Sequence, residues 1–132
     1  MNAGALELIL VPQGTLAEQI RAKGAGLGGV LTPTGLGTLV QEGKQVIEVD
    51  GKKYILEKPM KADLAIVEAT YADTFGNGVN IGTTRNFNPL MALAADVVVM
   101  GTYEVREPGK VDPSSVTIHG VLVDYLVEIV EA

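Results

Sequence analysis

Residues 45–69 read QVIEVDGKKYILEKPMKADLAIVEA, and this stretch does most to decide the fold. Residues 45–49 and 52–56 alternate apolar and polar side chains around the pair Asp50-Gly51. A pair of this kind between alternating runs favours a β-hairpin with a two-residue turn. Residues 63–69 (DLAIVEA) then form a mostly aliphatic run that is typical of a buried strand. The stretch therefore predicts a hairpin followed by a strand of a larger sheet.

Upstream of the hairpin, the pattern predicts a strand and then a helix. Residues 6–11 (LELILV) are apolar and partly β-branched, which predicts a buried strand that ends at Pro12. Thr15 is expected to cap the following helix, with Glu18 three residues later completing a capping box. Gly24 is the natural end of this helix.

Downstream of the hairpin, helix and strand signals continue to alternate. Residues 73–80 (DTFGNGVN) contain the Asp, Gly and Asn residues that favour a turn. A helix is expected over residues 89–95, capped by Asn88 and begun by a proline. Strands are expected over residues 96–100 and over residues 121–130. The order of elements predicts an α/β domain with a mixed sheet, flanking helices and a β-hairpin. Long aliphatic runs suit strands that are covered on both faces.

Composition narrows the class of protein. The chain has 132 residues, of which 47% are hydrophobic, and no linker divides it, so residues 1–132 are expected to form a single domain. The formal net charge is −6 without a basic run, which argues against nucleic acid as a partner. The absence of Cys excludes disulfides, and a single His argues against a zinc site. No apolar run reaches membrane-spanning length and no secretory signal is apparent, so we expect a cytoplasmic protein without a membrane partner.

A glycine-rich segment, residues 24–38 (GAGLGGVLTPTGLGT), is too dense in glycine for ordinary packing, with six glycines in fifteen residues. It contains a G-x-G-x-x-G match at Gly24, Gly26 and Gly29. A dinucleotide-binding turn should leave a strand and open a helix. Here a helical pattern precedes the glycines and Pro33 follows them. The segment therefore indicates a functional or interface loop.

Two further positions allow both a functional and a structural interpretation. Gln13 lies between a predicted strand end and a predicted helix, where its amide could donate to an oxyanion or merely bond the local backbone. Residues 85–88 (RNFN) precede the next helix and could accept an anion. Alternatively, Asn88 only caps that helix and Phe87 packs beside it.

Four collinear motifs resemble the α subunit of family I coenzyme A transferases, of the 3-oxoacid and acetate/butyrate–acetoacetate type. The first is residues 11–44, from VPQGT through the glycine-rich loop to QEGK. The others are residues 50–67 (DGKKYILEKPMKADLAIV), residues 82–96 (GTTRNFNPLMALAAD) and residues 107–127 (EPGKVDPSSVTIHGVLVDYLV). The resemblance implies a CoA-transferase-like fold and a ping-pong transfer of CoA between carboxylates through a glutamyl-CoA thioester. Coenzyme A would be a substrate, and no cofactor or metal is implied.

The chain departs from this family in two ways. The family's nucleophilic glutamate lies in a Ser-Glu-Asn-Gly motif of the β subunit, and no glutamate here has that setting. The chain also begins where an α subunit would be midway, so it resembles the C-terminal portion of one. We therefore expect a β-type partner subunit that carries the catalytic Glu, a homo- or hetero-oligomer, and no activity from this chain alone. The alternative is a non-catalytic module that binds an acyl-CoA or a partner, or a structural remnant.

The resemblance also implies roles for particular residues. Gln13 matches the glutamine of the family's Pro-Gln-Gly-Thr motif, which supports the catalytic glutamate and its adducts. Other positions match segments that border the substrate and CoA cleft, and these are Gly28, Gly29, Thr32, Thr34, Asn86, Phe87 and Asn88. For residues 86–88 a purely structural role stays equally open.

Overall fold

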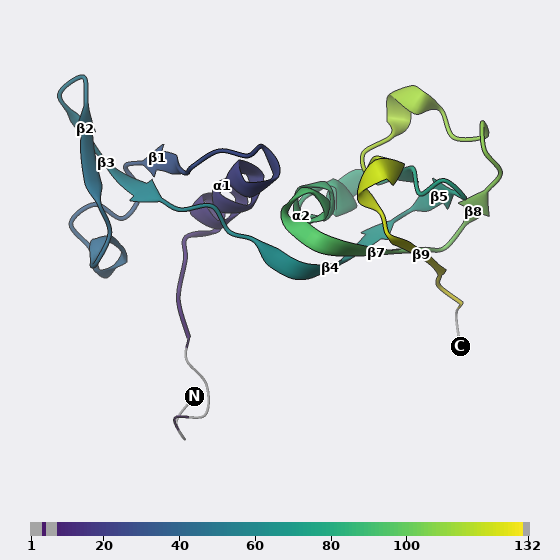
Figure 1. Ribbon diagram of the computed structural model, residues 1–132, viewed down its shortest axis with the longest axis horizontal. Coiled ribbons are helices and arrows are strands. Elements are labelled where there is room, and N and C mark those ends of the chain that lie inside the picture. Colours follow the sequence, from purple (N-terminus) through teal and green to yellow (C-terminus); the bar gives the residue numbers. More distant parts are fainter. Residues whose placement is uncertain (1–3, 5–7, 131–132) are drawn as a thin grey trace.

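The computed structural model describes residue 4 and residues 8–130, and it sets two groups of strands on either side of a pair of helices (Figure 1). Its helices and strands are α1 (Gln13–Gly24), β1 (Val30–Thr32), β2 (Val46–Val49), β3 (Lys52–Glu57), β4 (Ala62–Ala69), β5 (Tyr71–Asp73), β6 (Gly78–Val79), α2 (Asn88–Ala94), β7 (Ala95–Thr102), β8 (Val105–Arg106) and β9 (Tyr125–Glu128). Short 3₁₀ helices are η1 (Leu39–Gln41), η2 (Gly82–Arg85), η3 (Pro113–Ser115) and η4 (Gly120–Leu122). The α/β class is confirmed, with the strands divided among three small sheets.

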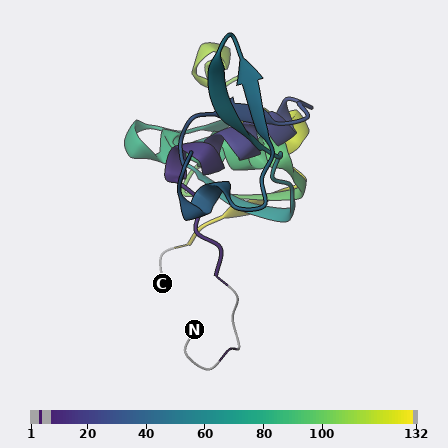
Figure 2. The ribbon, with the colours of Figure 1, turned by 90° about the vertical axis from the view of Figure 1, so that its left-hand side faces the viewer.

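The first sheet has the antiparallel order β1-β3-β2 and contains the predicted hairpin. β2 and β3 meet at the pair Val49↔Lys52, and Asp50 and Gly51 both have positive φ, at 50° and 73°. Positive φ at both central residues is the geometry of a type I′ turn, which explains the Asp-Gly pair. Figure 2 views the molecule from the end that this hairpin forms. The hairpin prediction is confirmed.

The second sheet is parallel, with the order β4-β7-β9. β4 and β7 align at Ala62↔Ala95 and stay in register to Ala69↔Thr102. α2 lies between them in the chain and covers one face of this sheet (Figure 1). The core consists of buried residues of this layer together with Ala72 of β5 and Ile118. The residues of the layer are Ala65, Val67, Ala69, Ala92, Val98 and Met100. The predicted strands at residues 63–69 and 96–100 are therefore confirmed.

The opposite face of the parallel sheet is open within the part of the chain that the structure describes. Ile66 is 70% exposed and Tyr125 is 62% exposed, although both lie in strands. Successive side chains of a strand point to opposite faces, and along β4 and β9 those on this face are exposed. The expectation that both faces of these strands are covered is therefore wrong for the described residues. Parallel sheets are normally covered on both faces.

The third sheet has the order β6-β5-β8 and includes the turn predicted at residues 73–80. The buried Asp73 carboxylate accepts hydrogen bonds from the backbone N–H groups of Phe75 and Asn77, at 3.0 and 2.9 Å. Asn77 in turn accepts the backbone N–H of Gly120 at 3.0 Å. The turn prediction is confirmed.

The N-terminal predictions need correction. Residues 8–12 form no strand, and Ile9 and Leu10 are 75% and 78% exposed; residues 6 and 7 of the predicted strand lie outside the described residues. A strand needs a neighbour, and residues 8–12 have none among the described residues. The Thr15–Glu18 capping box is also wrong, because α1 begins two residues earlier and Thr15 is buried inside it. Gly24 ends α1 as predicted.

Two predictions near the C-terminal half also change. Phe87, not Asn88, occupies the cap position of α2, and Asn88 is the first helical residue. Its side chain bonds other segments instead of capping, since its Oδ1 accepts from the Glu68 N–H. The terminal strand is limited to β9, because η4 occupies the first two residues, 121 and 122, of the predicted stretch.

Candidate functional site

Gln13 is the exposed first residue of α1, at a helix end without a side-chain cap. Pro12 precedes it in an extended conformation, with φ −57° and ψ 134°, and makes no side-chain cap hydrogen bond. Proline fixes φ and cannot continue a helix backward, so α1 starts sharply here. The first N–H groups of a helix have no intrahelical partner and carry partial positive charge. This end of α1 can therefore donate to a negatively charged group.

β1 and the turn that follows it form the opposite wall. The backbone N–H of Thr34 donates to the Thr32 hydroxyl at 3.1 Å, across Pro33. The N–H of Leu36 donates to the Pro33 carbonyl at 3.2 Å, which closes the turn. Thr32 is half-buried and Thr34 is exposed. The Thr-Pro-Thr sequence thus makes a defined turn beside β1.

A pocket of about 500 Å³ separates these two walls. Its lining residues come from the start of α1 and from β1 with its turn, and they are Pro12, Gly14, Thr15, Glu18, Val30, Leu31, Thr32 and Thr34. We call this space the α1–β1 cleft. The structure therefore brings Thr32 and Thr34 to the same cleft that the N-terminus of α1 borders, and Gln13 sits between two of its lining residues.

Gly28 and Gly29 lie just before β1 and have different surroundings. Gly28 is exposed, and a Cβ added there would meet nothing within 4 Å. Gly29 has φ +153°, and a Cβ there would lie 2.6 Å from the carbonyl oxygen of Glu57 in β3. Glycine at position 29 is thus required for β1 to approach β3.

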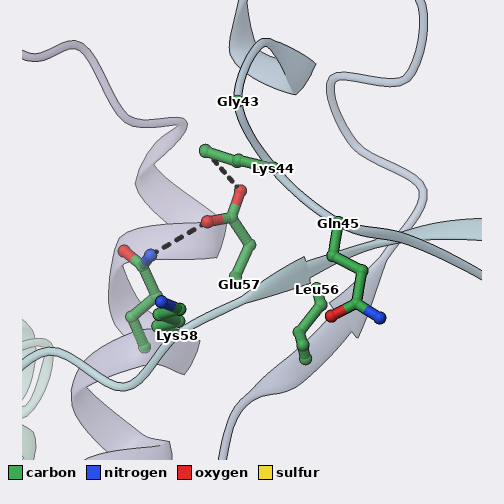
Figure 3. Close-up of a pocket in the computed structure, with 7 residues that line it drawn as sticks. Gly43, Lys44, Gln45, Leu56, Glu57 and Lys58 are labelled. Carbon is green, nitrogen blue, oxygen red and sulfur yellow. Dashed lines mark hydrogen bonds and ion pairs between the residues drawn. The ribbon is translucent and has the colours of Figure 1, made fainter.

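A buried carboxylate, that of Glu57, lies at the end of β3 beside α1 (Figure 3). Glu57 is 2% exposed, and its Oε1 accepts from Lys44 Nζ at 2.7 Å while its Oε2 accepts from Gln19 Nε2 at 3.0 Å. The Gln19 Oε1 is a buried atom without a hydrogen-bond partner in the described structure. These residues border a second pocket, of about 450 Å³, lined by Gln19, Gly43, Lys44, Gln45, Leu56, Glu57 and Lys58.

The cluster of Glu57, Lys44 and Gln19 was not predicted as a site from the sequence, although the sequence pattern places two of these residues on buried faces. Glu57 follows Ile55 by two residues in β3, and Ile55 is fully buried, so the strand period places Glu57 on the buried side. Gln19 follows the buried Thr15 by four residues, on the same side of α1. A charged side chain at an inward strand position needs a partner, but the sequence does not say which lysine supplies it.

Asn86, Phe87 and Asn88 lie apart from the cleft that Thr32 and Thr34 line. Asn86 is exposed at the end of η2, and Phe87 is half-buried at the cap position of α2. Asn88 Nδ2 donates to the Thr84 carbonyl at 3.0 Å, while its Oδ1 accepts from the Glu68 N–H at 3.0 Å. Asn88 also lines a third pocket, of about 470 Å³, beside β4, β7 and β9. The carboxyl ends of parallel strands are a usual place for ligands.

The ionisable groups whose pKa is shifted from its ordinary value lie at the surface, outside the two pockets beside α1. A hydrogen bond from Arg106 lowers the pKa of Glu104, and the same contact raises the pKa of Arg106. A hydrogen bond to Asp96 raises the pKa of Lys61. Hydrogen bonds from Ser114 lower the pKa of Asp112. None of these groups lines the α1–β1 cleft or the Glu57 pocket.

The described residues offer no metal site and no membrane-spanning helix. No group of three or more His, Cys, Asp or Glu side chains is placed to hold a metal ion there. Neither helix in that part of the chain has the length and apolar character needed to cross a membrane.

Comparison with known proteins gives a consistent result. A family model described as "Coenzyme A transferase" matches residues 1–129. The chain is 50% identical over 127 residues to the alpha subunit of the acetate CoA-transferase of Escherichia coli K12, covering 96% of this chain and 58% of that protein. It is 47% identical over 123 residues to the alpha subunit of the acetoacetyl-CoA:acetate/butyrate CoA transferase of Clostridium acetobutylicum, covering 93% of this chain and 56% of that protein. The chain thus spans little more than half the length of these relatives.

A solved structure supports the same relationship. The chain resembles an acyl-CoA transferase apoenzyme from Escherichia coli O157:H7 with a TM-score of 0.82 and 26% sequence identity. The likeness covers 90% of this chain and 27% of that one.

Proposed function

The chain belongs to the coenzyme A transferase family, and from that premise we propose that it is part of an α-type subunit that moves CoA between an acyl-CoA and a short-chain carboxylate or 3-oxoacid. The observation that carries the proposal is the family match over residues 1–129, joined to a cleft beside the uncapped start of α1, where Gln13 lies between the lining residues Pro12 and Gly14. Relatives named for acetate, and for acetoacetyl-CoA with acetate or butyrate, support a short carboxylate as the acceptor.

The proposed chemistry uses two covalent steps. A glutamate carboxylate, supplied by a β-type partner subunit, attacks the thioester carbonyl carbon of the acyl-CoA, the C–S bond breaks, and CoA leaves as a thiolate. The thiolate attacks the glutamyl carbonyl of the resulting anhydride, which releases the first carboxylate and forms a glutamyl-CoA thioester. The second acid reverses these steps, so no electron or proton is gained or lost overall. Dividing one transfer into easier covalent steps is nucleophilic catalysis.

In this scheme the described chain stabilises charge and orients substrate. Each attack turns a carbonyl oxygen into an oxyanion, and the Gln13 amide with the free N–H groups at the start of α1 would donate hydrogen bonds to it. The hydroxyl of Thr34 on the opposite wall of the cleft would help to position the acyl group. We propose that CoA acts as a substrate and that no other cofactor is required. The proposed setting is a cytoplasmic assembly with the β-type subunit.

The test is consumption of acetoacetyl-CoA with acetate as the acceptor. The chain is assayed alone and then within a full-length α subunit, in an assembly with a β-type subunit. We expect activity only from the assembly, because the nucleophilic glutamate is expected on the partner. Gln13→Ala in the assembly should lower kcat by about 10²- to 10³-fold, the usual cost of one oxyanion donor.

The control variant is Arg21→Met, which removes an exposed cation from the same helix. Transfer by the isolated chain would contradict the division of roles between subunits. A verified assembly that binds acyl-CoA without turnover would favour the non-catalytic module instead. An assembly whose Gln13→Ala variant keeps full kcat would remove Gln13 from the mechanism.

A further inference from the structure

Glu57 contacts both walls of the α1–β1 cleft without lining it. Its backbone pairs with Val30 of β1, and its carbonyl oxygen lies against Gly29, which leads into that strand. Its side chain accepts the Gln19 amide N–H of α1 at 3.0 Å. One residue of β3 therefore fixes the position of β1 through its main chain and of α1 through its carboxylate.

Lys44 completes this link by balancing the charge. The Glu57 side chain is 2% exposed, so its carboxylate has lost nearly all contact with water. Lys44, whose side chain is 30% exposed, comes from the segment before β2 and reaches Oε1 at 2.7 Å. A buried charge that loses its only ion-pair partner is strongly destabilised. The geometry of Glu57, and through it that of Gln19, thus depends on Lys44.

The Gln19 amide has one strong restraint on its orientation. Its Nε2 bonds to Glu57, while its Oε1 is buried without a partner among the described residues. A buried acceptor without a partner carries a desolvation penalty. The bond to Glu57 therefore holds this amide, and with it the first two turns of α1, in place despite the desolvation penalty of Oε1.

We propose that Glu57, charge-balanced by Lys44, is a positioning residue that sets the gap between α1 and β1 and so aligns Gln13 with the substrate across the cleft. The inference rests on the proposed function, because it assigns a role within that reaction. A displacement of about 1 Å at a reacting group can cost roughly 10²-fold in rate. Loosening the link should therefore slow turnover more than it weakens binding.

The variants are chosen to separate positioning from general stability. Lys44→Met removes the charge balance, Lys44→Arg restores a cation, and Arg21→Met removes the cation of an exposed Glu pair on α1 as the matched control. Gln19→Leu removes the hydrogen bond to Glu57 while leaving the Glu57–Lys44 ion pair in place, and it serves if Lys44→Met alone does not fold.

Two readouts are measured on the assembled enzyme. In the acetoacetyl-CoA assay, Lys44→Met should lower kcat by about 10- to 100-fold with a smaller change in KM, Lys44→Arg should recover most of kcat, and Arg21→Met should match the wild type. In amide hydrogen exchange, Lys44→Met should speed exchange of residues 16–19 of α1 and of β1 together, with unchanged exchange in β4 and β7.

Unchanged kcat and unchanged exchange in Lys44→Met, or in Gln19→Leu where that one is needed, would overturn the proposal. Equal losses from Lys44→Met and Arg21→Met would also overturn it. If the wild-type assembly shows no transferase activity, the proposed function fails while the exchange measurement still decides whether Glu57 holds the two walls together.

Discussion

Gly29→Ala is a sharp test of how the glycine-rich loop meets β3. Gly29 has φ +153°, a conformation that residues with a Cβ rarely adopt, and the added Cβ would lie 2.6 Å from the Glu57 carbonyl oxygen and 2.9 Å from Leu56 Cδ1. Leu56 Cδ1 is the far end of a side chain and can turn away, whereas the carbonyl is held in the pairing of β1 with β3. The substitution must therefore displace the loop or the strand.

The expected loss follows from separate contributions. The unfavourable φ costs about 1–3 kcal/mol, and forced displacement of packed backbone adds roughly 1–2 kcal/mol. Alanine restricts the unfolded chain, which returns about 0.4–1 kcal/mol. With each contribution taken at the middle of its range, the net loss is about 3 kcal/mol, which corresponds to a fall in Tm of roughly 10 °C for a chain of this size.

The assay is thermal and urea unfolding followed by circular dichroism, with Gly28→Ala as the control. Gly28 is the adjacent residue, has open space around its Cα and does not have a positive φ. Gly28→Ala should leave Tm unchanged or raise it slightly, because only the unfolded state is affected. Equal Tm values for the two variants would refute the reasoning, since they differ only in the contact and the backbone angle.

Other expected outcomes concern the second half of the chain. Asn88→Ala should lower the free energy of unfolding by about 1–3 kcal/mol, because it leaves the Glu68 N–H and the Thr84 carbonyl without their partner; unchanged urea midpoints would show that these bonds are replaced by water at no cost. Asp112 has its pKa lowered by Ser114 from 3.8, so the stability that its carboxylate contributes is present above that pH and lost as the pH falls through the folded-state pKa. The difference in Tm between the wild type and Asp112→Asn should therefore shrink below a pH of about 3.8, and a constant difference from neutral to acid pH would contradict this.

Local chemistry explains the parts of the fold that the sequence predicts. The turn at Asp50-Gly51 depends only on its own two residues and on alternation in the flanking strands, so the sequence predicts the hairpin directly. The aliphatic runs in β4 and β7 are long enough to identify as strands. Their partners and their parallel register depend on distant residues, which periodicity does not specify.

Where prediction fails, tertiary structure overrides a local signal. Thr15 has the right neighbour for a capping box, yet packing buries it and α1 starts at Gln13. Asn88 precedes a proline, as a cap would, but its side chain joins α2 to β4. Residues 8–11 are apolar enough for a strand, but a strand exists only when another pairs with it.

Part of the candidate site could likewise be predicted from the sequence, and part could not. The resemblance placed Thr32, Thr34 and Gln13 in one functional region, and the structure sets both threonines in the cleft beside the start of α1. The link between Glu57 and Lys44 joins residues 13 apart, and its bond to Gln19 joins residues 38 apart. Contacts of that kind arise from the folded arrangement and have no sequence motif of their own.

The parallel register of β4 and β7 has a consequence for the order of folding. Ala62 pairs with Ala95, so this sheet needs contacts between distant residues and the intervening α2, whereas the turn of the β2–β3 hairpin joins neighbouring residues. Hairpins form in about 1–10 μs, and pairings between distant residues form later because the loop between them must close first. A chain emerging during synthesis can therefore complete its hairpin while β4 still lacks a neighbour, and during that interval the apolar edge of β4 is available to other chains.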